Sequence, residues 1–275
     1  MELTLLGTGC PSVDYKRFGP SNLISTKKTK ILVDCGSGIT QRLHEIKISS
    51  AEIDALFFTH LHSDHAVDLY QLIISSWHSY RVKPWKIYGP KGTKKFVKKI
   101  MNAWYEERKL RISYEARAST KAFDIKVIEF KSIGNVRIKD LNIKYFEVDH
   151  KPVKFAYGFC FTNKNKKLTI SGDTKPCENL MKFAQKSDVL LHEVFIEGEI
   201  LEINKMRTKK TLHNVQSYHT SSLEVGKVAF ISRAKKLVLT HFVPTRFNKN
   251  NLKKVVKKDF GKDPIIGEDL MKIKI

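Results

Sequence analysis

The segment Thr59-His60-Leu61-His62-Ser63-Asp64-His65 places three histidines and one aspartate within six residues. It closes the apolar run Ala55–Thr59, which is typical of a β-strand, and precedes the helical pattern Ala66–Trp77. A strand that runs into a tight loop can project alternate imidazoles to one side, and the next residues can turn a carboxylate and a third imidazole toward the same point. Imidazole and carboxylate are ligands that suit zinc at neutral pH. The segment therefore predicts a metal site at the end of a strand.

Around this segment, short apolar strands alternate with helical patterns. The expected strands are rich in β-branched or aromatic residues and end at a turn former or a polar residue. They are Leu3–Leu6, Ile31–Asp34, Ala55–Thr59, Lys86–Tyr88, Leu141–Val148, Tyr157–Thr162, Leu168–Ser171, Val189–Glu193 and Leu237–Thr240. No linker or internal repeat divides the chain, so we expect one layered α/β domain over residues 1–275.

Helical periodicity is clearest in four stretches. They are Ala66–Trp77, Thr93–Tyr105, a helix opened by the capping-box spacing Ser221-Ser222-Leu223-Glu224, and Asn250–Lys258. The second stretch leaves its lysines in water and points four apolar side chains inward: Phe96, Val97, Ile100 and Trp104. These helices would cover the sheet surfaces.

The net charge of the 275 residues is +22, which is unusual for a chain with 41% hydrophobic and 28% charged residues. Such a field attracts polyanions and speeds their encounter. Lysines outnumber arginines 40 to 10, however, and arginine is the better bidentate reader of phosphate. Nucleic-acid binding and a genome-wide lysine bias therefore both stay open as explanations of the charge.

The four cysteines, Cys10, Cys35, Cys160 and Cys177, are far apart and form no CxxC pair. This usage fits reduced thiols better than a disulfide framework. The first residues lack the pattern of a signal peptide, and no apolar run approaches the roughly 20 residues of a membrane span. We expect a cytoplasmic protein with no membrane segment.

The pattern HxHxDH of His60–His65 resembles the signature of the metallo-β-lactamase superfamily, and the resemblance extends over nearly the whole chain. Further motifs follow in the order of that family. His150 comes after the expected strand Leu141–Val148, Asp173 lies in Ser171-Gly172-Asp173-Thr174, and His241 follows Leu237–Thr240. The resemblance implies a four-layer αββα metallo-β-lactamase sandwich with ligands at the strand ends.

The same resemblance implies a dinuclear zinc site, with Mn²⁺ or Fe²⁺ as substitutes for zinc. One zinc is held by His60, His62 and His150, the second by Asp64, His65 and His241, and Asp173 bridges the two. Two ions about 3.5–4 Å apart can hold a bridging water whose pKa falls toward about 7. The expected reaction is therefore a hydrolysis.

Two N-terminal segments narrow the choice within the superfamily. Leu5-Leu6-Gly7-Thr8-Gly9 and Val33-Asp34-Cys35-Gly36-Ser37-Gly38, the latter followed by Thr40-Gln41-Arg42-Leu43, resemble the ribonuclease Z (ElaC-like) group. That resemblance implies catalytic roles for Asp64 and for a pair formed by Glu193 and His219. A carboxylate can orient an imidazole and stabilise its charged form, so that it protonates a leaving alkoxide. Such help matters most for phosphodiesters with poor leaving groups.

One feature departs from the ribonuclease Z pattern. Enzymes of that group carry a tRNA-clamping arm between the residues equivalent to His150 and Asp173, whereas 22 residues separate the two here. The segment Leu69–Pro90 is similar to an armless subgroup, and Gly19-Pro20-Ser21-Asn22 is similar to arylsulfatase-like members. The leading hypothesis is a phosphodiesterase of the kind represented by an endoribonuclease that trims the 3′ end of tRNA precursors.

In the leading hypothesis the tRNA-guiding surface comes from three basic stretches: Lys91–Lys99, Lys205–Lys210 and Lys249–Lys258. The runner-up is a hydrolase of aryl sulfates or small phosphodiesters, which needs neither an arm nor a basic docking surface. Lactonase or thioesterase chemistry would not need the pair of Glu193 and His219, and a non-catalytic nucleic-acid binder would not need all seven ligands. A homodimer is what the resemblance suggests.

Overall fold

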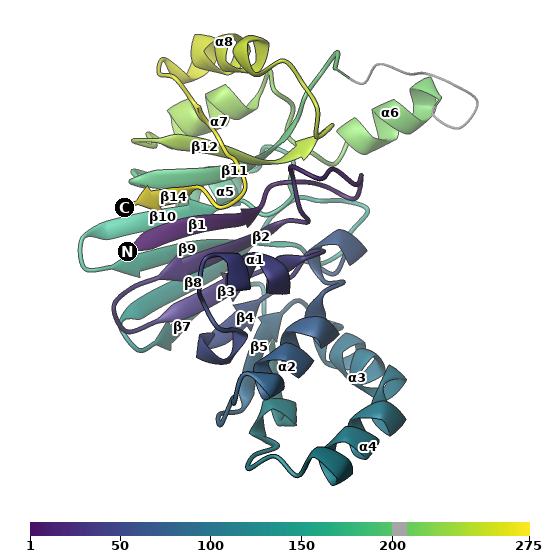
Figure 1. Ribbon diagram of the computed structural model, residues 1–275. Helices are drawn as coiled ribbons and strands as arrows, with labels where there is room; N and C mark the ends of the chain where they lie inside the picture. The colour runs from purple at the N-terminus through teal and green to yellow at the C-terminus, as the bar shows by residue number, and fades with distance from the viewer. Residues whose placement is uncertain (200–207) are drawn as a thin grey trace.

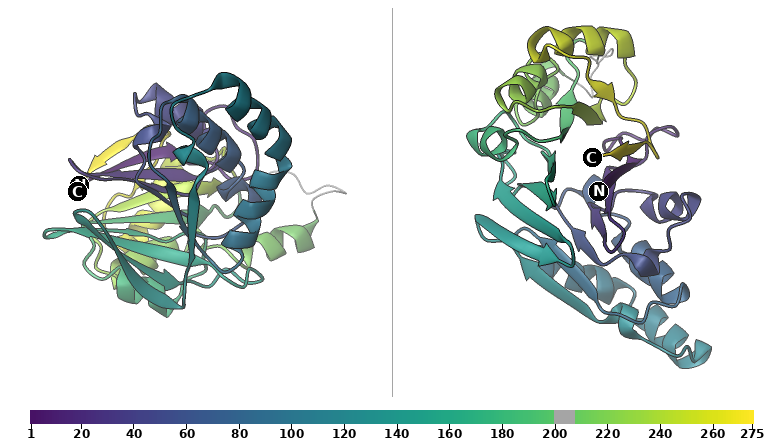
Figure 2. Two further views of the ribbon diagram at one scale, coloured as in Figure 1. Left: turned by 90° about the horizontal axis from the view of Figure 1, so that it is seen from below. Right: turned by 90° about the vertical axis from the view of Figure 1, so that its left-hand side faces the viewer.

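The computed structural model of the chain describes residues 1–199 and 208–275. Its strands form two seven-stranded sheets, which lie face to face (Figures 1 and 2). The first sheet has the order β14-β1-β2-β3-β4-β5-β6. Its strands are β1 (Glu2–Gly7), β2 (Ser21–Ser25), β3 (Lys30–Val33), β4 (Ala55–Phe57), β5 (Trp85–Gly89), β6 (Ile125–Glu129) and β14 (Lys272–Lys274).

The second sheet has the order β13-β12-β11-β10-β9-β8-β7. Its strands are β7 (Ile133–Ile138), β8 (Leu141–Glu147), β9 (Tyr157–Asn163), β10 (Lys166–Ile170), β11 (Val189–Phe195), β12 (Leu237–Val243) and β13 (Ile265–Ile266). Strands β10, β11, β12 and β13 are parallel, and β8 runs in the same direction because it is antiparallel to β9, which is antiparallel to β10. The carboxyl ends of β8, β10, β11 and β12 therefore meet at one edge of this sheet.

The space between the sheets holds the central core. On β4, alternation turns the Phe57 ring inward, where it stacks on Tyr88 of β5 at 4.5 Å between ring centroids and meets Phe159 of β9 edge-on at 5.7 Å. Burying one such side chain is worth roughly 1.5–3 kcal/mol, so the aromatic cluster contributes substantially to holding the two sheets together.

Helices cover the outer faces of both sheets. The helices that cover the first sheet are α1 (Ile39–Glu45), α2 (Leu69–His78) and α3 (Thr93–Ala103). Those that cover the second sheet are α5 (Glu178–Phe183), α7 (Val225–Ile231) and α8 (Lys249–Phe260). Figure 2 shows the resulting succession of helix, sheet, sheet and helix. The predicted αββα metallo-β-lactamase sandwich is confirmed.

Two helices contribute no buried residue: α4 (Tyr105–Glu115) and α6 (Lys209–Gln216), which projects to the right in Figure 1. Three short 3₁₀ helices complete the described elements, η1 (Ser50–Glu52), η2 (Ser63–His65) and η3 (Lys121–Phe123). Among the described residues, none of the helices combines the length and apolar character needed to cross a membrane.

Each of the nine predicted strands is present, although the bounds differ by up to a few residues. The predicted inward position of Trp104 is wrong, because its side chain is 51% exposed. Helix α3 ends at Ala103 and the chain turns at Trp104 into α4, so the helical period of α3 no longer applies to this residue. Trp104 instead stacks on Tyr70 at 5.3 Å between ring centroids.

Candidate metal centre

All seven predicted ligand side chains come together where the strand ends of the two sheets meet. They form two sets, and within each set the ligand atoms lie within 4.8 Å of one another. One set is His60, His62, His150 and Asp173, and the other is Asp64, His65 and His241. The donor set consists of imidazole nitrogens and carboxylate oxygens, which hold a divalent cation such as zinc. This cluster can therefore hold metal.

Local backbone geometry aims the side chains that follow β4. His60 and His62 occupy alternate positions of an extended segment, so their rings point to the same side. The chain then closes into η2, where the His65 backbone N–H donates to the carbonyl of His62 at 3.1 Å. This turn brings Asp64 and His65 back toward the two imidazoles.

His241 reaches the cluster from within β12 by means of a β-bulge. The pairing of β11 with β12 shifts register at this point, because Glu193 faces Thr240 and Val194 faces Phe242. His241 is the extra residue and has a left-handed backbone with φ of 45°. Bulges beside functional sites re-aim a side chain at the cost of local strain.

Asp173 lies at the centre of the cluster. Its Oδ2 atom is 3.3 Å from Nε2 of His65 and from Nε2 of His241, 3.8 Å from Nε2 of His60 and 3.9 Å from Nε2 of His150. One carboxylate oxygen thus faces both ligand sets, which is the position that a bridging ligand would occupy.

The electrostatics of the cluster fit a bound cation. The Nε2 atoms of His60 and His65 are buried and have no hydrogen-bond partner among the described residues. Burial, together with the neighbouring imidazoles, lowers the pKa of His60 well below its usual value, so its ring is neutral as a ligand must be. Burial also opposes charge on His65, yet the carboxylates of Asp173, Asp34 and Asp64 raise its pKa well above the usual value. The site therefore favours positive charge.

The sequence reasoning assigned no role to Asp34, which orients part of the cluster. This buried carboxylate, at the end of β3, lies 2.9 Å from His65 Nδ1. It also accepts hydrogen bonds from the backbone N–H and the hydroxyl of Thr59, both at 2.8 Å. An outer carboxylate of this kind fixes ring orientation and raises ligand basicity. Since β3 is parallel to β4, a polar residue at its carboxyl end was a usable signal.

Glu193 and His219 lie together beside the cluster. His219 Nδ1 is 3.2 Å from Glu193 Oε1, an ion-pair contact whose alignment is poor for a hydrogen bond. The same oxygen accepts hydrogen bonds from the backbone N–H groups of Thr174 at 3.1 Å and Thr220 at 2.9 Å. Burial opposes charge on His219, but the carboxylates of Glu193 and Asp173 together raise the pKa of His219 to about 9.

His219 is also close to the ligands themselves. One of its ring nitrogens lies within 4.8 Å of ligand atoms of Asp173 and His241, and its ring is 5.6 Å from that of His241. His150 is held from the other side, because its Nδ1 donates to the carbonyl of Tyr218 at 2.8 Å. The segment from Tyr218 to His219 therefore contacts both halves of the cluster.

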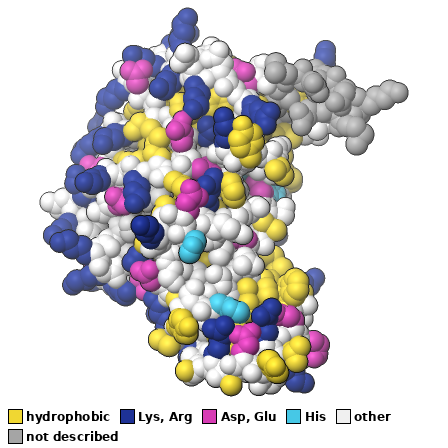
Figure 3. Space-filling model, viewed as in Figure 1, with side chains coloured by type: hydrophobic (Ala, Val, Ile, Leu, Met, Phe, Trp, Pro, Cys, Tyr) yellow, Lys and Arg dark blue, Asp and Glu magenta, His cyan; other side chains and the backbone are white. Residues whose placement is uncertain are grey.

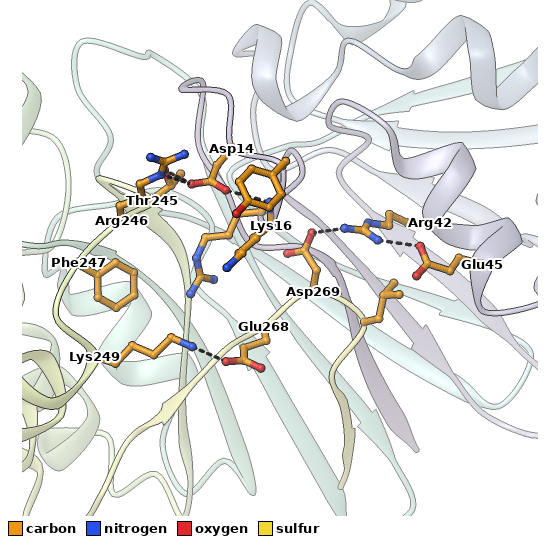
Figure 4. A pocket seen from close by; sticks show the side chains of 13 residues that line it. Asp14, Lys16, Arg42, Glu45, Thr245, Arg246, Phe247, Lys249, Glu268 and Asp269 are labelled. Carbon is orange, nitrogen blue, oxygen red and sulfur yellow. Dashed lines mark hydrogen bonds and ion pairs between the residues drawn. The ribbon is translucent and has the colours of Figure 1, made fainter.

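A cavity of about 380 Å³ adjoins the cluster at Asp64 and is walled by the loop from Cys10 to Gly19. Its volume is in the range of small-ligand sites. A larger cavity of about 830 Å³ lies on the other side of the same loop, away from the cluster (Figure 4). Ion pairs cross its walls, among them Arg246 with Asp14 at 3.0 Å and Lys249 with Glu268 at 2.5 Å. The smaller cavity is the better placed for a substrate.

The predicted basic surfaces are exposed where the structure describes them. The lysines at positions 94, 95, 98 and 99 on α3 and several lysines of α8 face solvent. Residues 205–207 of the stretch Lys205–Lys210 lie outside the described residues. On the face shown in Figure 3, Lys and Arg side chains gather along the left-hand side, where Figure 1 places both termini.

Comparison with known proteins identifies relatives by sequence and proteins of similar fold. Residues 1–202 match the family model of the anti-Pycsar protein Apyc1. The chain is 34% identical over 248 residues to ribonuclease Z of Mycobacterium bovis, which covers 89% of this chain and 86% of the relative. The fold is similar to that of the metallo-β-lactamase fold protein YhfI of Bacillus subtilis, with a TM-score of 0.77, 19% identity and 99% coverage of both chains. It is also similar to human tRNase Z, short form, with a TM-score of 0.74, 23% identity and coverage of 100% and 99%.

Proposed function

Because this chain belongs to a family of metal-dependent hydrolases that includes ribonuclease Z and the anti-Pycsar protein Apyc1, we propose that it cleaves phosphodiester bonds with two zinc ions. The substrate we favour is RNA, at the 3′ end of tRNA precursors. The name of the Mycobacterium bovis relative and the net charge of +22 support this choice. The runner-up class of substrate is small phosphodiesters or aryl sulfates.

In this proposal His60, His62 and His150 would hold one ion, Asp64, His65 and His241 would hold the second, and Asp173 lies between the two sets. The bound ions would supply an activated water and would neutralise charge that builds on the attacked phosphate. Asp34 keeps the proton of His65 on Nδ1, so that Nε2 is free to coordinate. The protein contributes a fixed, buried geometry that needs little rearrangement during the reaction.

The observation that carries the phosphodiester assignment is the contact of Glu193 with His219 at the edge of the cluster. A pKa of about 9 keeps the metal-free imidazole protonated at neutral pH, with Nδ1 toward Glu193 and Nε2 left to face a substrate. We infer that His219 donates this proton to the departing 3′ oxygen. Proton transfer by a positioned side chain contributes about 10²–10⁴-fold to rate. Esters with good leaving groups would need no such donor.

The test is a side-by-side assay of the zinc-loaded protein on a precursor tRNA, bis(p-nitrophenyl) phosphate and an aryl sulfate. The relative kcat/KM values rank the substrate classes directly. We expect cleavage of the precursor at its 3′ extension and turnover of the diester, with the aryl sulfate slowest. Turnover of the aryl sulfate above both phosphodiesters would contradict the proposal.

A second candidate, hydrolysis of small cyclic or linear phosphodiesters, is favoured by the short connection of β9 to β10. Only Lys164 and Asn165 lie between these strands, so no arm extends from this hairpin. The cavity of about 380 Å³ beside Asp64 suits a ligand of nucleotide size. Turnover of small diesters together with intact precursor tRNA would select this candidate. The expected homodimer and cytoplasmic location stay predictions.

A further inference from the structure

A groove of about 670 Å³ lies on the outer face of the second sheet, beside α5. Strand register places its polar residues on one surface. Asn135 of β7 faces Lys144 of β8, and on the neighbouring row Asn142 of β8 faces Thr162 of β9, which faces Lys167 of β10. The alternate residues of these strands pack in the core between the sheets, so the groove face is the side turned to solvent.

The groove is positively charged without compensation. Its lining includes Lys144, Lys167 and Lys182 but no carboxylate, and none of the three ammonium groups has a carboxylate oxygen within 4.0 Å among residues 1–199 and 208–275. Elsewhere on the surface, exposed lysines such as Lys235 and Lys257 do have such partners, Asp188 at 2.8 Å and Asp263 at 2.9 Å. The groove is therefore suited to an anion from outside the chain.

Two of the ammonium groups share one aromatic ring. Lys144 Nζ is 5.5 Å and Lys182 Nζ is 5.9 Å from the centroid of Phe183, which in turn stacks on Phe146 at 4.5 Å. Like charges gathered over one ring repel each other, and a phosphate between them would relieve that repulsion. Asn142 and Thr162, which line the same groove, add hydrogen-bond donors.

The groove and the metal centre lie on the same strands. Strand β8 carries Lys144 and leads to His150, and β10 carries Lys167 and leads to Asp173. The six residues from Lys144 to His150 span at most about 20 Å. A structured RNA of tRNA size is long enough to contact the metal centre and the groove at once.

We propose that this groove binds the phosphate backbone of an RNA substrate at a distance from the cleaved bond, and so replaces part of the grip that an arm between β9 and β10 would give. The inference rests on the proposed function, because it concerns how that substrate is held. Backbone contacts position RNA without reading its sequence. The groove then affects KM for long RNA and leaves the chemical step unchanged.

The test compares the zinc-loaded wild type with the double variant Lys144→Ala/Lys182→Ala. The matched control is Lys227→Ala/Lys262→Ala, which removes two exposed lysines that have no carboxylate partner among the described residues, Lys262 lying 5.7 Å from the ring of Phe260. We measure KM and kcat for precursor tRNA, and binding of labelled mature tRNA by fluorescence anisotropy across a salt series. Kinetics with bis(p-nitrophenyl) phosphate report on the metal centre.

The expected result for the groove variant is an increase of about 10-fold or more in KM and Kd for tRNA, with kcat and the small diester unaffected. The slope of log Kd against log salt becomes shallower by about 1.4–1.8, as two lost phosphate contacts require. Equal losses in the control variant, or equal affinity for polyglutamate and tRNA, would overturn the groove as an RNA site. If the wild type turns over the small diester but leaves precursor tRNA intact, RNA is not the substrate, whatever the groove variant does.

Discussion

The metal cluster and the lysine groove lie along the same strands, yet they are built in opposite ways. At the cluster, His150 and Asp173 are buried, and the buried Nε2 atoms of His60 and His65 have no hydrogen-bond partner among the described residues, as ligand atoms kept for an ion would. In the groove, Lys144 and Lys182 are exposed and have no carboxylate partner among the described residues. The difference suggests two tasks, a preorganised centre for chemistry and an adaptable surface for holding RNA. Changes of the metal ligands should affect every substrate, whereas changes in the groove should affect only long substrates.

The largest effect is expected from Asp173→Ala. Its central carboxylate faces both ligand sets, so we expect kcat/KM to fall by about 10⁴-fold or more for RNA and for small diesters alike. Metal content, measured by mass spectrometry of the purified protein, should fall as well. The control Asp263→Ala removes an exposed carboxylate that pairs with Lys257 at 2.9 Å, and it should keep full activity. A substrate-selective loss in the Asp173 variant would contradict the division between the two regions.

Glu193→Gln should have the next largest effect, about 10²-fold on RNA cleavage. The carboxylate raises the pKa of His219 to about 9 without metal, and bound cations must lower that pKa. Since the acid works only when protonated, RNA cleavage falls as pH rises through the pKa of His219. Without the carboxylate this pKa drops, so the alkaline limb of the pH–rate profile moves to lower pH. An unchanged alkaline limb would mean that another group titrates there.

A smaller effect is expected from Asp34→Asn, which keeps a hydrogen-bond acceptor for His65 but removes the charge. Metal affinity should fall by about 10–100-fold, as for other outer-shell carboxylates. Competition with a chelator measures the affinity, and excess zinc should restore activity. Activity that stays low at saturating zinc would assign Asp34 a role in catalysis itself.

The regions also differ in how far the sequence predicted them. The cluster could be predicted because His60, His62, Asp64 and His65 are crowded into one short segment, and because imidazoles and carboxylates at strand ends are informative residue types. The sandwich could be predicted from alternation within the longer strands. Short or edge strands such as β13 and β14 carry too few residues for a periodic signal.

The groove could not be predicted, because its residues come from β7, β8, β9, β10 and α5 and meet only through strand register. In sequence, Lys144 and Lys167 are two lysines among 40. Asp34 lies within a recognisable motif, but its partner His65 follows β4, and only the pairing of β3 with β4 brings the two residues together. The bulge that orients His241 could not be predicted from the sequence either, since it depends on how β12 pairs with β11. Long-range pairing decided each of these features.

At this metal cluster, we propose that His219 donates a proton to the leaving group of a phosphodiester. It is tested most directly by kcat/KM of His219→Ala on precursor tRNA and on bis(p-nitrophenyl) phosphate, with His44→Ala as a matched control of an exposed histidine. We expect a loss of about 10²–10⁴-fold on tRNA and little change on the aryl diester, whose leaving group needs no proton. Equal losses on both substrates would contradict it and would instead make His219 a ligand or a positioning residue.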